Sequence, residues 1–229
     1  YALKTNDSLK FAVLTGCMRI SRESIFTGLN NFKVLAITDA RFDEQFGFTE
    51  QEVSELLETY HLEEHQAETK EWYDGYHMGE IDVYCPWDVM NYLRELQRNP
   101  KAQPVSYWKN TSDNAIIRSF IDMKSDTITG KLEILMSGGY INQKIEENLT
   151  YDYLNSSEDN LWSVLYLTGY LTRMRKSDLT ETEWIGLENS GKTALTIPNA
   201  EIREIFETTI QKWFDDSART WNRTGLFDA

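Results

Sequence analysis

The chain has 229 residues, and its 37 Asp and Glu against 23 Lys and Arg give a net charge of −14 at pH 7. So acidic a surface repels phosphate backbones, which disfavours a protein that coats nucleic acid. Hydrophobic residues make up 41% of the chain and aromatic residues 13%, so the chain can form packed cores and is not disordered.

The apolar runs argue against a membrane span, and the cysteines favour a reducing compartment. No apolar run exceeds four residues, which is far too short to span a bilayer. Cys17 and Cys85 are the only cysteines, which excludes a disulfide framework and favours a reducing, cytoplasmic environment. The chain begins with Tyr1 and a polar stretch, so we expect a piece of a longer protein, whose activity needs parts outside this chain.

Residues 1–48 have the pattern of a fragment of a parallel sheet. Residues 9–15, LKFAVLT, form a continuous apolar run ended by Gly16, which predicts a buried strand. Residues 32–37, FKVLAI, predict a second strand. Residues 39–48 form a loop with several phenylalanine anchors. We therefore predict a first unit that ends at residue 48.

Residues 49–214 are predicted to be mostly helical. Thr49 and Glu52 have the spacing of a capping box, and an apolar stripe follows them. Pro86 stands at a favoured first helical position. The helices predicted in this part span residues 49–60, 63–73, 86–97, 113–123, 126–136 and 158–167.

The end of this second unit has a different pattern. Residues 140–145 and 170–174 predict strands, and residues 184–187 and 193–197 predict a hairpin across a turn at 189–191. Asn199 is the expected cap of a last helix over residues 201–214. This order of helix, strands, hairpin and helix favours a winged-helix-like module, followed by a polar linker or tail over residues 215–229.

The sharpest motif is GLENSGKT at residues 186–193, which matches the phosphate-loop pattern G-x-x-x-x-G-K-[ST]. A phosphate loop needs a buried strand before it and a helix directly after it. A charged segment precedes this match, and a strand-like segment ended by Pro198 follows it. We therefore interpret the match as a hairpin turn, with Lys192 in solvent.

Other candidate sites are weaker. His61 and His65 are four residues apart, but no third histidine or cysteine lies near, so a solvated helix end is favoured over a metal site. Arg19 lies close to Cys17 in the sequence and could lower the pKa of the Cys17 thiol, but a small buried residue is the commoner explanation. We expect no bound metal in this chain.

An unusual density of aromatic residues marks the middle of the chain. The aromatic side chains concerned are Trp72, Tyr73, Tyr76 and Trp87. They could line a ligand pocket in a lid or stack on a base. The favoured alternative is a core seam between two helices, in which the two tryptophans pack together.

Five segments closely resemble the AAA-ATPase-like proteins of bacteria. They cover most of the chain in the family's order. They are LTGCMRISRESIFTGLNN at 14–31, FGFTEQEV at 46–53, EWYDGY at 71–76, PWDVMNY at 86–92 and LTIPNAEIREIF at 195–206.

The resemblance implies a P-loop ATPase domain, a helical and winged-helix-like middle, and often a C-terminal PD-(D/E)xK nuclease-like domain. This chain would hold the last strands of the ATPase core and the middle part. ATP and Mg²⁺ would bind in the parent protein, with none expected in this fragment. Thr15 matches the polar sensor of the γ-phosphate, and Arg19 or Arg22 would meet phosphate. Surface arginines paired with acids are an equal alternative.

We therefore expect an α+β, mostly α chain, with a remnant of a P-loop ATPase sheet, a helical lid and a winged-helix-like module. The chain would act as the sensor and lid of the parent, whose other parts are its first partner. The alternative is a non-catalytic interaction module that binds proteins or a second copy. DNA would require a local basic face, for which the candidates are Arg173, Arg175, Lys176 and Lys192.

Overall fold

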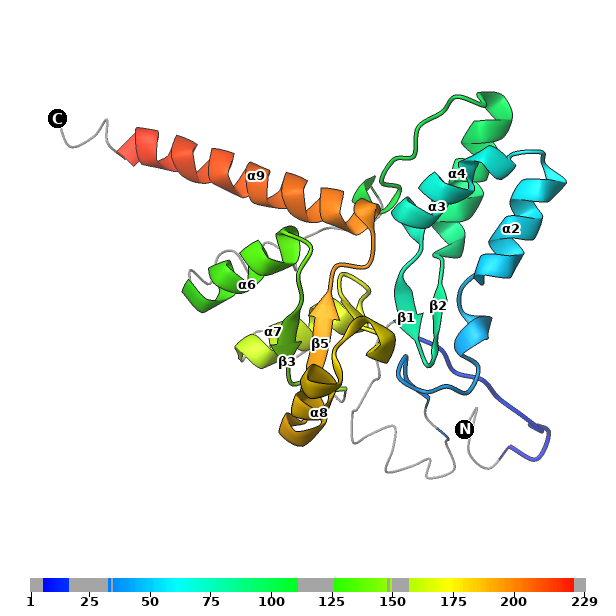
Figure 1. Ribbon diagram of the computed structural model, residues 1–229, viewed down its shortest axis with the longest axis horizontal. Helices are drawn as coiled ribbons and strands as arrows, with labels where there is room; N and C mark the ends of the chain where they lie inside the picture. The colour runs from blue at the N-terminus through cyan, green and yellow to red at the C-terminus, as the bar shows by residue number, and fades with distance from the viewer. Residues whose placement is uncertain are drawn as a thin grey trace.

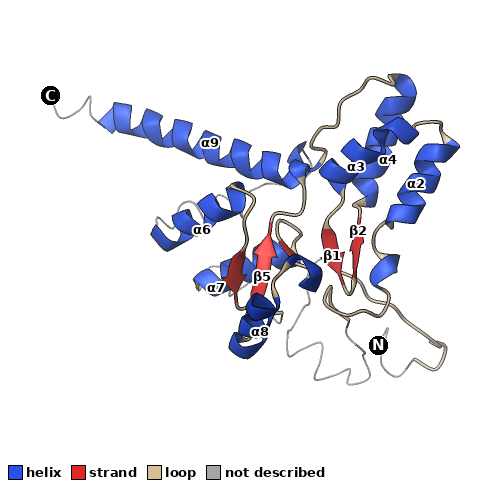
Figure 2. Ribbon diagram, in the orientation of Figure 1, coloured by secondary structure: helices blue, strands red, loops and turns tan. Residues whose placement is uncertain are grey.

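A computed structural model describes residues 6–16, 33, 35–110, 126–147, 149 and 157–224, which are mostly helical with two small sheets (Figure 2). The fold is α+β with a majority of helix, as the sequence predicts. Two groups of elements lie on either side of the β1–β2 hairpin, and the long helix α9 projects from their junction (Figure 1). No helix in the described ranges is both long and apolar enough to cross a membrane.

The first group contains three helices and the hairpin. The helices are α2 (Glu50–Thr59), α3 (Gln66–Tyr73) and α4 (Pro86–Arg98), and the hairpin strands are β1 (Tyr76–Met78) and β2 (Ile81–Val83). Short 3-10 helices at Asp43–Gln45 and Glu63–His65 precede α2 and α3. The Thr49 side chain accepts from the Glu52 backbone, and Glu52 accepts from the Thr49 backbone, so the predicted capping box begins α2.

The second group surrounds a three-stranded antiparallel sheet. Its helices are α6 (Asp126–Met136), α7 (Glu158–Leu167) and α8 (Glu181–Ser190). Its strands are β3 (Ile141–Gln143), β4 (Thr172–Arg173) and β5 (Thr193–Thr196), in the spatial order β3-β5-β4. A 3-10 helix at Trp108–Asn110 precedes this group, and another at Lys176–Asp178 lies between β4 and α8. The last helix, α9, spans Ala200–Thr224.

Two hydrophobic clusters form the core; the hairpin strands contribute to the second, and the residues directly before and after the hairpin contribute to the first. Tyr73 and Tyr84 pack in the first cluster, between α2, α3 and α4. Tyr76 and Val83 pack in the second, with the three-stranded sheet, α6, α7 and the first turns of α9. The backbone of His77 on β1 also donates to the Thr172 hydroxyl on β4 at 2.8 Å. The hairpin therefore lies where the two groups meet.

The strand predicted over residues 9–15 is wrong. Residues 6–16 have no regular secondary structure, and the side chain of Phe11 is 82% exposed. A strand buried on both faces needs partner strands, and no described strand pairs with this segment. The second predicted strand, over residues 32–37, is also not formed at its described positions, 33 and 35–37. The helix predicted over residues 113–123 lies outside the described ranges.

The hairpin predicted across residues 184–197 is also wrong, because its first half is helix α8. Thr180 and Glu183 form a capping box that begins this helix, and Gly191 ends it with a left-handed conformation at φ 61°. Only the second half is a strand, β5, and it pairs with β3 and β4. The capping box was the signal in the sequence that the hairpin interpretation overlooked.

The last helix is longer than predicted. The Asn199 Oδ1 atom accepts from the Ile202 backbone at 3.0 Å, which confirms the predicted cap. The helix then continues to Thr224, so the helix end predicted at residue 214 is wrong. Polar composition alone does not end a helix when no breaker is present.

The two tryptophans predicted to pack in one core lie in different environments. Trp72 is half-buried against the first hydrophobic cluster. Trp87 is 56% exposed at the start of α4, so it is not a core residue, because the buried face of this helix begins with Asp88 and Val89.

Substitution of each tryptophan separates these environments. Trp72→Ala should lower the free energy of unfolding by about 2 kcal/mol, because half of an indole loses its packing. Trp87→Ala should lower it by no more than about 0.5 kcal/mol, as is usual for exposed positions. Thermal melts of both variants measure this, and equal losses would contradict the assignment.

Candidate functional site

Three of the segments that carry the family resemblance meet at the first turn of α9. We call this contact the joint and define it by Asp74, Gly75, Asp88, Asn199 and Glu201. Asn199 Nδ2 donates to the Asp74 carbonyl at 2.9 Å, across 125 residues of chain. Gly75 has φ 96°, and a Cβ atom there would lie 2.3 Å from the carbonyl oxygen of the residue before Asn199. Only glycine allows so close an approach.

A buried pair of carboxyl groups completes the joint. Asp88 on α4 and Glu201 on α9 both have no exposed surface, and both Asp88 oxygens and Glu201 Oε2 lack a hydrogen-bond partner within the described residues. Glu201 Oε1 also accepts from the Trp108 backbone at 2.9 Å. Burial and the charge of Asp88 raise the pKa of Glu201 to about 8. Burial also raises the pKa of Asp88. The pair therefore holds a proton at neutral pH, because two buried carboxylates in contact repel each other.

The joint is structural in this conformation. Carboxyl pairs that share a proton act as acid and base in some enzymes, but neither Asp88 nor Glu201 has surface that a substrate could touch. The neighbouring thiol of Cys85 is also a poor nucleophile, because burial raises its pKa to about 12. What the joint does is hold α3, α4 and the Trp108 segment against α9.

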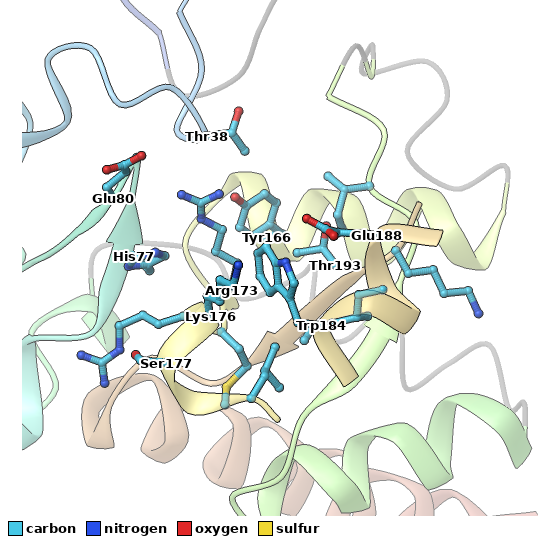
Figure 3. A pocket seen from close by; sticks show the side chains of 18 of the residues that line it. Thr38, His77, Glu80, Tyr166, Arg173, Lys176, Ser177, Trp184, Glu188 and Thr193 are labelled. Atoms are coloured by element: carbon cyan, nitrogen blue, oxygen red, sulfur yellow. The ribbon is translucent and has the colours of Figure 1, made fainter. Parts of the chain in front are cut away.

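A separate cavity of about 760 Å³ lies between the β1–β2 hairpin, the segment before the 3-10 helix at Asp43–Gln45, and the second group (Figure 3). All four basic residues proposed as a DNA-binding face contribute to its lining: Arg173, Arg175, Lys176 and Lys192. Its volume is in the range of small-molecule sites in proteins.

Acidic residues balance the basic ones in this cavity. Glu80, Glu147 and Glu188 also line it. Arg175 Nη1 is 2.8 Å from Asp82, and its Nε is 2.7 Å from Asp178, so its charge is already paired. A hydrogen bond from His77 and the charge of Arg175 lower the pKa of Asp82. Such a wall is nearly neutral and does not form the basic face that duplex DNA requires.

The remaining predicted sites are not gathered into one place. Thr15 is exposed in an irregular segment, and Arg19 and Arg22 lie outside the described residues. Tyr73 and Tyr76 are buried in separate clusters, so the core seam is favoured over a lid pocket. The histidines form no metal site in the part of the chain that the structure describes. His65 is buried and its Nδ1 is hydrogen-bonded to a glutamate.

The GKT match has the reverse of a phosphate-loop context. Helix α8 precedes it and strand β5 follows, and Gly186 lies inside the helix. Helical N–H groups already have carbonyl partners, so they cannot wrap a phosphate. Lys192 is exposed, as the hairpin interpretation also expected.

The comparisons give one distant relative. The chain is 24% identical over 233 residues to "Uncharacterized protein in vnfD 5'region" of Azotobacter chroococcum mcd 1. The alignment covers 99% of this chain and 40% of that protein, so the chain spans less than half of its relative's length. No family model and no solved structure matches the chain.

The carboxyl pair predicts an unusual pH dependence. Folding raises the pKa of the Glu201 carboxyl to about 8. The stability that this shift contributes is fully present below the pKa of the carboxyl in the unfolded chain, and it is lost as the pH rises through the pKa in the folded protein. The protein should therefore be more stable near pH 5 than near pH 8. At pH 8, the free energy of unfolding of Glu201→Gln should be higher than that of the parent by about 1–2 kcal/mol, because the neutral amide can donate to Asp88.

Urea melts of both proteins at several pH values measure this difference. Glu204→Gln on the same helix is the matched control, because Glu204 forms a partly exposed ion pair with Lys109. Between pH 5 and pH 8, the free energy of unfolding of Glu204→Gln should change with pH as that of the parent does. If the parent and Glu201→Gln lose stability equally over this range, the shared proton is refuted.

Proposed function

We propose that this chain is the sensor and lid part of an AAA-ATPase-like protein and is not catalytic alone. The observation that supports this most is the joint, because EWYDGY, PWDVMNY and LTIPNAEIREIF meet there. Segments far apart in the sequence thus resemble one family and form one contact. A fold that needs this contact explains why the same three segments occur together.

The lid would work as one body because the joint connects its two groups. Residues 35–43 connect it to the N-terminal part. Gly79 N donates to the Ile37 carbonyl at 2.9 Å, and Thr38 Oγ1 donates to Glu147 at 2.9 Å. A movement of the segment that carries Thr15, Arg19 and Arg22 would reach both groups through these bonds. This is the connection that a sensor and lid require.

The nucleotide site would lie in the remainder of the parent protein. The longer Azotobacter relative, of which the chain spans 40%, leaves room for an ATPase core and a further domain. ATP and Mg²⁺ would bind there, and a guanidinium of Arg19 or Arg22 would contact phosphate oxygens in the closed state. The cytoplasm is the proposed compartment.

The second candidate is an interaction module, favoured by the strand order β3-β5-β4 around α6 and α7. We infer a winged-helix-like arrangement from this order, with α8 between the last two strands in place of a simple wing. Protein partners are proposed over DNA, because the net charge is −14 and Glu80, Glu147 and Glu188 accompany the basic residues.

Nucleotide binding tests the lid assignment. Calorimetry with ATP and Mg²⁺ should give no measurable heat on this chain. In the full-length protein, Lys192→Ala should change ATP affinity less than twofold. Arg19→Ala or Arg22→Ala should slow hydrolysis tenfold or more, because a phosphate-contacting guanidinium is lost. Tight ATP binding by this chain, abolished by Lys192→Ala, would overturn the proposal.

A further inference from the structure

Three buried hydrogen-bond donors line the cavity without an acceptor. They are the Tyr166 hydroxyl on α7, the Arg173 Nε on β4 and the Trp184 Nε1 on α8, and none has a partner within the described part of the chain. Figure 3 shows these three side chains gathered between His77 and Glu80 on one side and Glu188 and Thr193 on the other.

Such donors are rare in folded proteins. A buried N–H or O–H without an acceptor destabilises the fold, and most are paired. Tyr166 is only 2% exposed, so its hydroxyl has lost water without gaining a protein acceptor. Burial raises its pKa to about 12, which keeps the hydroxyl protonated and able to donate at neutral pH. Three unpaired donors from three elements around one cavity indicate an absent acceptor.

The charges around the donors suggest what this acceptor is. Arg173 is always protonated, and Lys176 lies over the Trp184 ring with its Nζ 5.3 Å from the ring centre. Glu147 is the carboxylate whose charge contributes to the raised pKa of Tyr166. One of its oxygens already accepts a hydrogen bond from the Thr38 hydroxyl. One oxyanion provides enough lone pairs for several donors and balances a guanidinium, which a neutral carbonyl does not.

We propose that this cavity binds a small molecule through an oxyanion, a phosphate or a carboxylate, held by Tyr166, Arg173 and Trp184. The three donor atoms have almost no exposed surface, so binding requires that their side chains rotate toward the oxyanion. Glu80 and Glu188 at the exposed rim accept from hydroxyl or amino groups at the other end of the molecule. This site goes beyond the proposed lid function and stands whether or not the parent protein hydrolyses ATP.

The indole N–H of Trp184 provides a direct readout by NMR. Inorganic phosphate or succinate is titrated into the ¹⁵N-labelled chain at constant ionic strength, with chloride as the reference anion. Trp184→Phe assigns the signal among the seven tryptophans. We expect a saturable downfield shift of this signal at millimolar anion. The Trp162 indole, which already donates to Glu158 at 3.1 Å, should not move and serves as the internal control.

Variants test the other two donors. Tyr166→Phe removes one oxygen and should weaken binding threefold or more. Arg173→Gln should weaken it at least tenfold, whereas Arg173→Lys should retain part of it. Glu147→Gln should tighten binding. Tyr140→Phe is the matched control, because its hydroxyl bonds Glu183 and the residue does not line the cavity.

The two probes also separate the sources of the oxyanion. Tighter binding of phosphate than of succinate assigns a phosphate, and the reverse order assigns a carboxylate. The proposal is overturned if neither anion shifts the Trp184 signal beyond the chloride reference. It is equally overturned if folded Tyr166→Phe and Arg173→Gln bind as tightly as the parent. Melting curves establish that each variant is folded.

Discussion

The contact between the first turn of α9 and the ends of α3 and α4 determines how this chain is organised. Asn199 caps its own helix with one side-chain atom and reaches the Asp74 carbonyl with another. Glu201, two residues further on, accepts from the Trp108 backbone and lies buried close to the Asp88 carboxyl, whose charge acts on it. The short β1–β2 hairpin also connects the two groups, through the bond from His77 to Thr172. Polar bonds of defined geometry fix their relative position, which apolar packing alone does not do.

This arrangement gives different roles to the two polar regions of the molecule. The joint has no exposed surface at its carboxyl pair, so its chemistry serves the fold. The residues around the cavity beside the hairpin carry unpaired donors and mixed charge, so this is the region in which we propose a ligand. Thr38 belongs to the segment that leads into the first group, and it lines the cavity. A ligand there would therefore contact the N-terminal segment and the second group together.

Local signals in the sequence predicted most helices, and they failed where the outcome depends on distant residues. The Thr49 capping box and the Asn199 cap are set within a few residues, so spacing reveals them. The apolar run at residues 9–15 gives no strand, because strand formation needs partners that local sequence does not show. No spacing relates Asp88 to Glu201 or Tyr166 to Trp184. These sites arise from burial and proximity, which only the folded chain provides.

Native-state hydrogen exchange on Asn199→Ala tests the central role of the joint most directly. The substitution removes the cap of α9 and the bond to Asp74 together, while the apolar clusters keep all of their side chains. If the joint holds the two groups together, amide protection should fall by a similar factor in α3, in α4 and in the β3-β5-β4 sheet. A loss confined to the first turns of α9, with α3 and α4 as protected as in the parent, would contradict the account.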